Sequence, residues 1–297
     1  MAAGFTSVDL SRLPAPNVIE VIDFETILAE MLADLRERDP TFDALVPSDP
    51  AFKILEVAAY REMLVRQRVN DAAKAVMLAY AQRADLDQLG ALLGVARLVI
   101  DPGNPDEGIP PTMESDEDFR RRIQLSPEGF SVSGPEGAYV FHTLSADAAV
   151  LDASVTSPTP GTVVVSVLSR DGNGAASQAL LDTVAAKLTS DDVRPMTDFV
   201  TVQSAEIVEY EVDATVYTFA GPDSTVVLAE AEANLRRYVD ESHRMGRDVT
   251  LSGIYAALHV GGVQRVVLAA PLADIVISRT QASFCTGITV THGGIGE

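Results

Sequence analysis

The spacing of apolar residues changes along this chain of 297 residues, and the change falls at residues 101–114. Before that segment, apolar residues recur every three or four positions, which is the period of an amphipathic helix. After it come stretches that alternate with a period of two, which is typical of strands. The segment itself, DPGNPDEGIPPTME, holds four prolines and two glycines, so we expect an exposed linker there.

This change of period predicts an α+β protein with an all-helical N-terminal part. Four segments follow from it: an N-terminal arm and helical domain at 1–100, the linker at 101–114, a first α+β unit at 115–205 and a second at 206–297. We expect two small mixed α/β units with mainly antiparallel sheets, because the short turn SPTPG at 157–161 joins two predicted strands as a hairpin. The last residues, GGIGE at 293–297, are expected to be a frayed tail.

Individual elements are also predicted. In the N-terminal part we expect an extended arm at 1–21, a first helix that Asp23 caps and Pro40 ends, and a short helix from about Asp85 that Gly94 ends. Strands are expected at 149–155, 162–168, 199–202, 207–217 and 263–269, and helices at 115–123, from 134 onward, and at 175–188, 226–239 and 251–259. The stretch AYVFH at 138–142 is similar to IYAALH at 254–259, and a predicted strand follows each of them. This recurrence suggests an internal repeat.

Residues 51–82 give the strongest helix signal, because a seven-residue apolar repeat fits them. One row of the repeat is Ala51, Ala58, Val65, Ala72 and Ala79, and the other is Leu55, Glu62, Val69 and Val76. Residues 51–83 also hold six basic residues against three acidic ones, in a chain of formal net charge −21. A helix packed inside its own domain explains the apolar rows, whereas packing against another chain also explains the basic excess. The candidate partner-interface residues are Arg61, Val65, Arg66, Arg68, Val69 and Val76.

Charge and composition exclude several classes of protein. With 43 acidic against 22 basic residues, the surface repels phosphate backbones and anionic membranes, so nucleic-acid binding is not expected. No apolar run is long enough to span a bilayer, and no basic and apolar leader is visible at the start. The single cysteine, Cys285, cannot form an internal disulfide.

The glycine-rich stretch GNGAAS at 172–177 comes closest to a cofactor motif. It follows a predicted strand and opens a predicted helix, as a dinucleotide-binding loop does. However, Ser177 stands where that motif has a glycine or alanine, and the preceding strand belongs to a hairpin. We interpret the stretch as a turn and keep nucleotide binding as the alternative.

No catalytic, cofactor-binding or metal-ligating set is recognised elsewhere in the sequence. His142 and His259 are expected to be half-buried core histidines on helices, and Cys285 to be a small buried apolar residue. The acidic run at 116–118 with three arginines at 120–122 is typical of a solvated helix face that complements the helix dipole. These observations predict a protein that is not an enzyme and needs no cofactor.

Several short motifs occur in a characteristic order. The first group is DPAFKILEVAAYRE at 49–62, RQRVNDAA at 66–73 and ADLDQLGALLGV at 84–95. The second group is ESDEDFRRRI at 114–123, SGPEGAY at 133–139 and VTSPTPGTVVV at 155–165. Together they resemble the baseplate assembly protein J family of contractile phage tails.

The resemblance implies a structural subunit of the baseplate wedge of a contractile phage tail or tail-like bacteriocin, needed for baseplate assembly and rearranged on contraction. It implies contacts with other wedge subunits or another copy of the chain, and with the hub and sheath region. It also implies a place in the virion or tail-like particle after synthesis in the bacterial cytoplasm. The alternatives are a component of a type VI secretion baseplate and a nucleotide-binding enzyme that uses the turn Gly172–Ser177.

We expect limited proteolysis to cut the chain first within residues 101–114, because the prolines, glycines and acidic residues there favour an exposed, irregular backbone. Mass spectrometry of the first stable fragments locates the cuts. First cuts inside residues 51–82 would contradict the predicted domain boundary.

Overall fold

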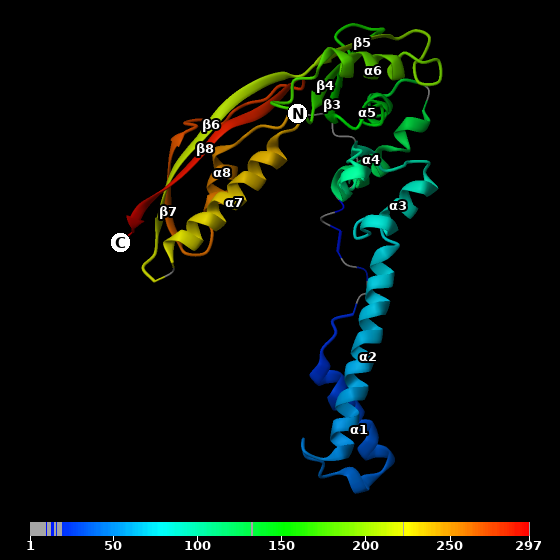
Figure 1. The fold of residues 1–297 in the computed structure, drawn as a ribbon, viewed down its shortest axis with the longest axis vertical. Helices are drawn as coiled ribbons and strands as arrows, with labels where there is room; N and C mark the ends of the chain where they lie inside the picture. Colours follow the sequence, from blue (N-terminus) through cyan, green and yellow to red (C-terminus); the bar gives the residue numbers. More distant parts are fainter. Residues whose placement is uncertain are drawn as a thin grey trace. The chain divides into compact units, whose positions relative to one another are not determined.

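The computed structural model describes residues 10, 13, 14, 16, 20–131, 133–221 and 223–296 (Figure 1). The described chain divides into two compact units. One comprises the described residues up to Ala96 together with Asp116–Arg120, and the other comprises Arg97–Ser115 and the described residues from Arg121 onward. The α+β class and the helical N-terminal part are confirmed. The predicted arm at residues 1–21 lies mostly outside the described residues.

Two helices, α1 (Phe24–Arg38) and α2 (Pro50–Ala75), pack together in the helical unit. The predicted cap of α1 is confirmed, because Asp23 Oδ2 accepts a hydrogen bond from the Thr26 amide at 2.8 Å. The helix ends before Pro40, which opens a short 3-10 turn. The buried residues at the contact between the two helices are Ile27, Leu28 and Ala59.

The long second helix is shorter than predicted. α2 ends at Ala75, and the next residues form turns where one continuous helix was predicted. The guanidinium of Arg120 donates to the carbonyl oxygens of Leu78 and Ala81, each at 2.7 Å. Arg120 belongs to α4 (Asp116–Leu125), and it supplies hydrogen-bond donors to two carbonyls in the turns after α2. In a continuous helix, backbone amides would donate to these carbonyls. At about 1.5 Å per residue, α2 is roughly 39 Å long.

A third helix, α3 (Arg83–Leu92), ends where Gly94 adopts a φ of +70°, as the sequence predicted. A β-hairpin follows, in which β1 (Val99–Asp101) pairs antiparallel with β2 (Thr112–Met113) on either side of a 3-10 turn (Pro105–Glu107). The segment predicted as a linker therefore contains regular structure, although most of its residues are exposed. Its use as a domain boundary stays a prediction.

The first sheet module combines three strands with two helices. Its elements are α5 (Glu136–Leu144), β3 (Val150–Thr156), β4 (Thr162–Ser169), α6 (Gln178–Leu188) and β5 (Phe199–Ser204), preceded by a 3-10 turn (Glu128–Phe130). β4 lies in the centre, antiparallel to β3 and parallel to β5. The predicted hairpin is confirmed, and a parallel pairing joins it because α6 connects β4 to β5 as a crossover.

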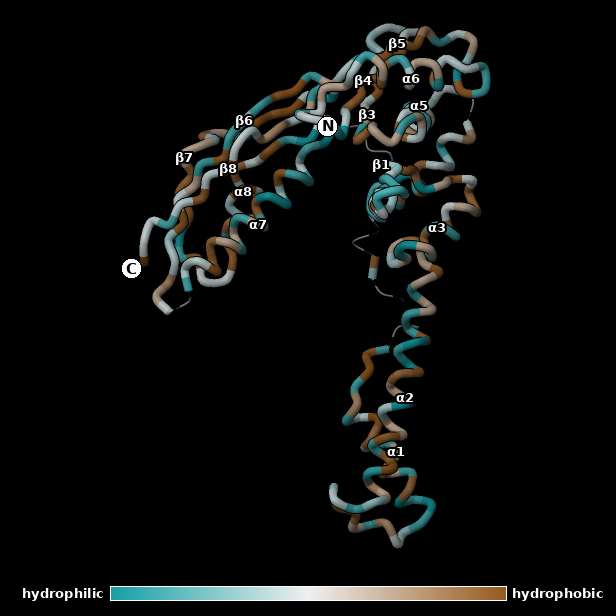
Figure 2. The backbone as a smooth tube through the Cα atoms, in the orientation of Figure 1, coloured by the Kyte–Doolittle hydropathy of each residue, from teal (hydrophilic) through white to brown (hydrophobic). Residues whose placement is uncertain are grey.

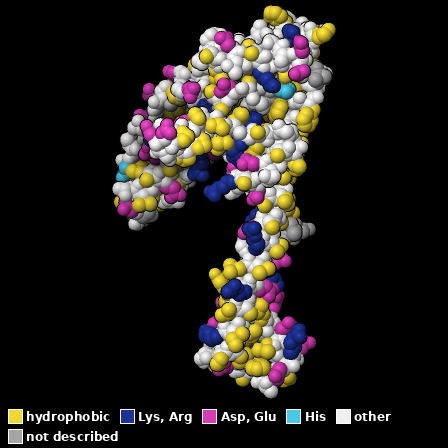
Figure 3. All heavy atoms as spheres, turned by 45° about the vertical axis from the view of Figure 1, so that its right-hand side comes forward, with side chains coloured by type: hydrophobic (Ala, Val, Ile, Leu, Met, Phe, Trp, Pro, Cys, Tyr) yellow, Lys and Arg dark blue, Asp and Glu magenta, His cyan; other side chains and the backbone are white. Residues whose placement is uncertain are grey.

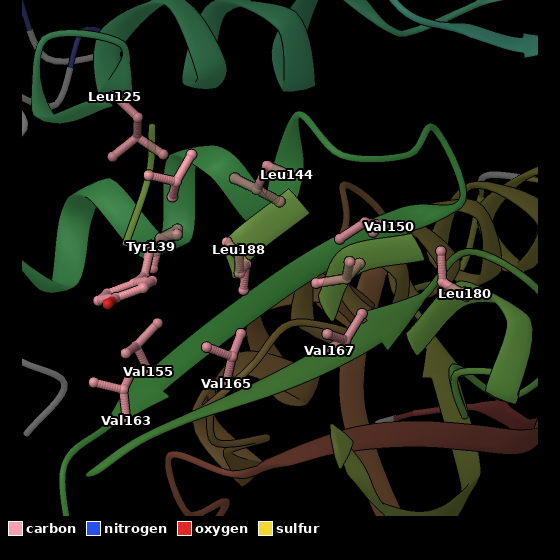
Figure 4. Close-up of a cluster of buried hydrophobic side chains, with 13 residues drawn as sticks. Leu125, Tyr139, Leu144, Val150, Val155, Val163, Val165, Val167, Leu180 and Leu188 are labelled. Atoms are coloured by element: carbon pink, nitrogen blue, oxygen red, sulfur yellow. The ribbon is translucent and has the colours of Figure 1, made fainter. Parts of the chain in front are cut away.

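The core of this module lies where α5 and α6 pack against the sheet (Figure 4). Alternate residues of β4, namely Val163, Val165 and Val167, belong to the core, with exposed fractions of 8%, 0% and 0%. Tyr139 of α5 is also buried, and its hydroxyl donates to Asp198 Oδ2 at 2.8 Å. Burial, and then the hydrogen bond to this carboxylate, raises the pKa of Tyr139 above its usual value.

The arginines at 120–122 of α4 do not form the solvated face that the sequence predicted. Arg120 holds the carbonyls after α2, as described above. Arg121 Nη2 donates to Asp152 Oδ1 of β3 at 2.7 Å. Arg122 Nε and Nη2 donate to the two oxygens of Glu114 at 2.7 Å and 2.6 Å, and both side chains of this pair are buried. Successive residues of a helix point about 100° apart, so one triplet binds three different elements.

The second sheet module is built around one long strand. Its elements are β6 (Glu206–Thr218), α7 (Ser224–Ser242), α8 (Leu251–Leu258), β7 (Val263–Ala270) and β8 (Gln281–Ile295). β6 lies between β7, which is antiparallel to it, and β8, which is parallel to it. α7 and α8 lie along the sheet (Figure 1), and the core between them includes Val212, Val216, Leu235, Ile254 and Leu258.

The last strand, β8, was not predicted, and the frayed tail predicted at 293–297 is wrong for its described part. β8 continues to Ile295, and Gly294 pairs with Tyr217 of β6. A side chain on Gly293 would come within 2.6 Å of the Tyr217 ring. Glycine therefore allows β8 to pass close to an aromatic residue. A glycine-rich strand end of this kind has the same composition as a flexible tail, and this explains the wrong prediction.

The two sheets share one pairing plan. Each has a central strand with one antiparallel and one parallel neighbour. In the first sheet α5 packs on β3 and α6 on β5, and in the second α8 packs on β7 and α7 on β8. The helices α5 and α8 carry the two similar sequences, and each leads into the antiparallel edge strand. The order along the chain differs, because α5 and β3 precede their central strand whereas α8 and β7 follow theirs.

We expect Leu188→Ala to lower the free energy of unfolding by about 2–5 kcal/mol, because Leu188 is fully buried in the first core and truncation leaves a cavity. Leu92→Ala is the matched control, since Leu92 is 81% exposed and its loss should change stability by less than about 0.5 kcal/mol. Urea unfolding of the purified chain measures both values. Equal effects would contradict the placement of this core.

Candidate assembly surface

The side of α2 that faces away from α1 is apolar and exposed. Its apolar residues have exposed fractions between 46% and 70%, and they are Ile54, Val57, Leu64, Val65 and Val69 on the helix and Val76 directly after its last residue. At about 100° per residue, these six lie within an arc of roughly 140°. The opposite side carries Ala59, which is fully buried in the contact with α1. Single exposed apolar residues are ordinary, but a row along a 26-residue helix is typical of a packing surface.

Five of the six candidate interface residues lie on this face. They are Arg61, Val65, Arg68, Val69 and Val76, and all five are exposed. Their positions fall within about 100° of one another around the helix. The structure therefore gathers two arginines and three valines on one surface, which we call the α2 face together with Ile54, Val57 and Leu64. Binding of a partner to the α2 face stays a prediction.

Arg66 lies away from the others, at about 130° from the centre of the α2 face. Its Nη2 donates to Glu62 Oε1 at 2.5 Å, and its Nη1 lies 3.7 Å from Glu20 Oε2. The hydrogen bond with Glu62 raises the pKa of Arg66. Arg66 thus has carboxylate partners within the helical unit, beside an open hollow of about 490 Å³ lined by Ile27, Glu30, Met31, Ala33, Asp34, Glu62 and Arg66.

The α2 face is also basic. Within the part of the chain that the structure describes, no ion pair joins Arg61 or Arg68 to a carboxylate. Figure 2 shows hydrophobic positions recurring along α2, and Figure 3 shows hydrophobic and basic side chains lying together on the surface of the helical unit. A partner surface that matches this face needs apolar residues in its centre and carboxylates near its edge.

Sequence reasoning missed Ile54, Val57 and Leu64. A seven-residue row drifts by about 20° per repeat around a straight helix of 3.6 residues per turn. The row that starts at Leu55 therefore begins against α1 and ends on the exposed side at Val76. Steps of three and four residues from Ile54 would have found the missing positions, because they follow one face of a straight helix.

The glycine-rich stretch at 172–177 forms a turn in which backbone amides already have partners. The Ala175 amide donates to Asn173 Oδ1 at 3.2 Å, and the Ala176 amide donates to Ser204 Oγ at 2.9 Å. A phosphate-binding loop presents free amides to its ligand. The geometry therefore supports the interpretation as a turn over a nucleotide-binding loop.

The remaining polar candidates do not assemble into a site. His142 is half-buried on α5, as predicted, and burial lowers its pKa. His259 is exposed just beyond α8, so the expected half-buried position is wrong for this residue. Cys285 is half-buried on β8, and burial raises the pKa of its thiol.

Among the described residues no group of His, Cys, Asp or Glu is placed to hold a metal ion. In the same part of the chain, every helix is too short or too polar to cross a bilayer.

The chain is thus an α+β protein with a helical part and two mixed-sheet modules, and known families contain this combination. Three family models match it in order: the Baseplate J-like N-terminal domain at residues 47–104, the Baseplate J-like central domain at 131–204 and the Baseplate J-like protein C-terminal domain at 210–291. The chain belongs to the baseplate J-like family, and the resemblance noted in the sequence is confirmed.

A phage protein with a high sequence identity to this chain agrees with this assignment. The chain is 54% identical over 300 residues to Baseplate protein J of Escherichia phage P2. The matched region covers 98% of this chain and 99% of that protein. Among solved structures, a chain of the cryo-EM structure of the anti-feeding prophage baseplate is similar with a TM-score of 0.40 and 14% identity. That match covers 60% of this chain and 44% of the other.

We expect Val65→Asp to change the stability of the isolated chain by less than about 0.5 kcal/mol, because Val65 is 63% exposed and its carboxylate would stay hydrated. Ala59→Asp, on the opposite side of α2, should cost about 3 kcal/mol or more, because it buries an unpaired charge against α1. Thermal unfolding of the two variants compares the sides directly. A large loss of stability in Val65→Asp would show that the α2 face is packed inside the isolated chain.

Proposed function

We propose that this protein is a structural subunit of the baseplate wedge in a contractile phage tail or tail-like particle. The observation that supports this most directly is 54% identity to a phage baseplate protein J over nearly the full length of both chains. The order of the three family models along the chain supports the same conclusion. In this role the protein is not an enzyme and binds no cofactor.

Within the wedge, the α2 face packs against another chain. Six apolar side chains that are 46–70% exposed would become buried there. Taking one such side chain from full exposure to full burial contributes about 1.5–3 kcal/mol. Because these six are only 46–70% exposed, their burial together contributes roughly 5–10 kcal/mol before the entropic cost of association. This amount suits an interface that forms during assembly and rearranges when the tail contracts.

The two arginines of the α2 face favour a different wedge subunit over a second copy of α2. In a face-to-face pair of α2 helices, Arg61 and Arg68 of both copies would enter one interface, and like charges repel there. A partner with carboxylates at the rim of an apolar patch would instead form charge-assisted hydrogen bonds with both arginines. Other wedge subunits, and beyond them the hub and sheath region, are therefore the proposed neighbours.

The proposal places the protein in the baseplate of the particle, after synthesis in the bacterial cytoplasm. Particles that carry a tagged copy of the chain test both the location and the interface. Electron microscopy should find the tag at the baseplate.

Arg61→Glu combined with Arg68→Glu should lower the yield of tagged particles at least about tenfold, which corresponds to about 1.4 kcal/mol of interaction. The melting temperature of the isolated variant should stay unchanged, because both residues are exposed.

A charge-matched control separates the interface from the overall charge. Lys187→Glu combined with Arg237→Glu changes the net charge equally at exposed positions of α6 and α7, and it should give a normal yield. Normal yield from the α2 variant would exclude this face as an interface, and a tag located away from the baseplate would reject the assignment to the wedge.

A further inference from the structure

We propose that Asp152 is a conformational relay, which couples the position of α4 to that of the segment after α7 in the second sheet module. The inference goes beyond the proposed place in a wedge and does not depend on it, because every contact involved lies within one chain. It gives a physical role to Arg121, which has no part in the proposed assembly surface.

Asp152 lies on β3, where the pairing with β4 shifts its register, and it is only 3% exposed. Its Oδ1 accepts hydrogen bonds from Arg121 Nη2 at 2.7 Å and from the Ala153 amide at 2.8 Å. Its Oδ2 accepts one from the Met245 amide at 3.0 Å. A single buried carboxylate therefore connects α4, β3 and the chain that follows α7.

The two charged partners differ in their access to water. The Arg121 side chain is 39% exposed, whereas the Asp152 side chain is 5% exposed. If α4 moves, Arg121 can regain hydration, but Asp152 remains buried with two amide donors and no cation. A buried, uncompensated charge is strongly unfavourable. The junction must then open to admit water, and Met245 is the residue whose amide loses its acceptor.

The neighbouring arginine keeps this half of α4 in place. Arg122 binds both oxygens of Glu114, and the two side chains are 5% and 2% exposed. Arg122 Nη1 also donates to Ser145 Oγ, beyond the end of α5, at 3.2 Å. Because Arg122 is fixed, the contact between Arg121 and Asp152 depends on the position of α4. It does not depend only on the rotation of one surface side chain.

The other contacts between the two sheet modules include polar contacts and one small apolar cluster. The Arg279 guanidinium binds the Glu136 carboxylate and donates to the Val155 carbonyl at 3.2 Å. Gly174 lets the His243 ring approach, since an added Cβ would lie 2.9 Å from Nε2. Among the described residues, the buried apolar cluster at this junction consists of Leu168, Ala205 and Ala282, and the partly buried Leu151, Ile207 and Met245 pack against it. This cluster is small, so the polar contacts add to what keeps the junction closed.

Hydrogen exchange of the Met245 amide, resolved by NMR in the full-length chain, tests the relay. Arg121→Gln removes the cation but keeps a long polar side chain, and it should speed exchange at Met245 at least about tenfold. Adding Asp152→Asn removes the buried charge, and the single carbonyl oxygen of asparagine can still accept from the Met245 amide while the Ala153 amide loses its acceptor. Exchange at Met245 should therefore return to within about threefold of the original rate. A packing role for Arg121 would not be rescued in this way.

The control is Arg236→Gln, which removes an exposed pair with Glu232 on α7 and should leave exchange at Met245 unchanged. The amide of Val216, in the core strand β6, reports global unfolding and should be unaffected in every variant. Unchanged exchange at Met245 in Arg121→Gln, or fast exchange that persists after Asp152→Asn is added, overturns the proposal. Should Arg121→Gln not fold, Arg121→Met with and without Asp152→Asn gives the same comparison, because methionine is also long and uncharged, and acceleration and rescue are again expected.

Discussion

The buried ion pair between Arg122 and Glu114 is the contact on which the arrangement around α4 depends. Both carboxylate oxygens accept from the guanidinium, and Oε2 also accepts from the Leu98 amide at 3.2 Å. Arg97 Nη1 donates to the Glu114 carbonyl at 2.7 Å, so the β1–β2 hairpin is held by the same residue. Removing one partner of such a pair leaves a buried charge, typically at a cost of about 3–5 kcal/mol. The stretch 114–123, which carried part of the family resemblance, supplies this pair and the two neighbouring arginines.

Features that depend on a few adjacent residues could be predicted from the sequence. The cap at Asp23, the positive φ at Gly94 and the hairpin at 157–161 each follow from the stereochemistry of one residue or one turn. Most predicted helices and strands agree with the structure within a few residues, because alternating and helical apolar patterns determine which face is buried. The family, too, was visible in short ordered motifs.

Features that depend on distant residues could not be predicted. The turns that follow α2 contain carbonyls that Arg120 binds, and Arg120 lies 42 residues beyond Leu78 in sequence. The strand character of Gly293 depends on the Tyr217 ring of a neighbouring strand. Within the candidate interface, the basic excess singled out Arg66 together with Arg68, but a helix separates positions two apart by about 200°, so the two arginines face different surroundings. Five of the six candidates nevertheless lie on one face, because their spacing along the helix places them within about 100° of one another.

The charges around the α2 face decide what a partner of this face meets. At physiological salt, the Debye length is about 8 Å, so a molecule that approaches α2 meets mainly the charges within that distance, although the whole chain has a net charge of −21. Only a surface in contact with α2 meets Arg61 and Arg68 individually. A folded partner with a few carboxylates beside an apolar patch would meet both arginines at this short range. Carboxylates are abundant in this chain, with 43 acidic residues, yet among the described residues none forms an ion pair with Arg61 or Arg68. Two bases that stay unpaired amid such an excess of acid, on an apolar helix face, agree with the proposal of an acidic partner outside the chain.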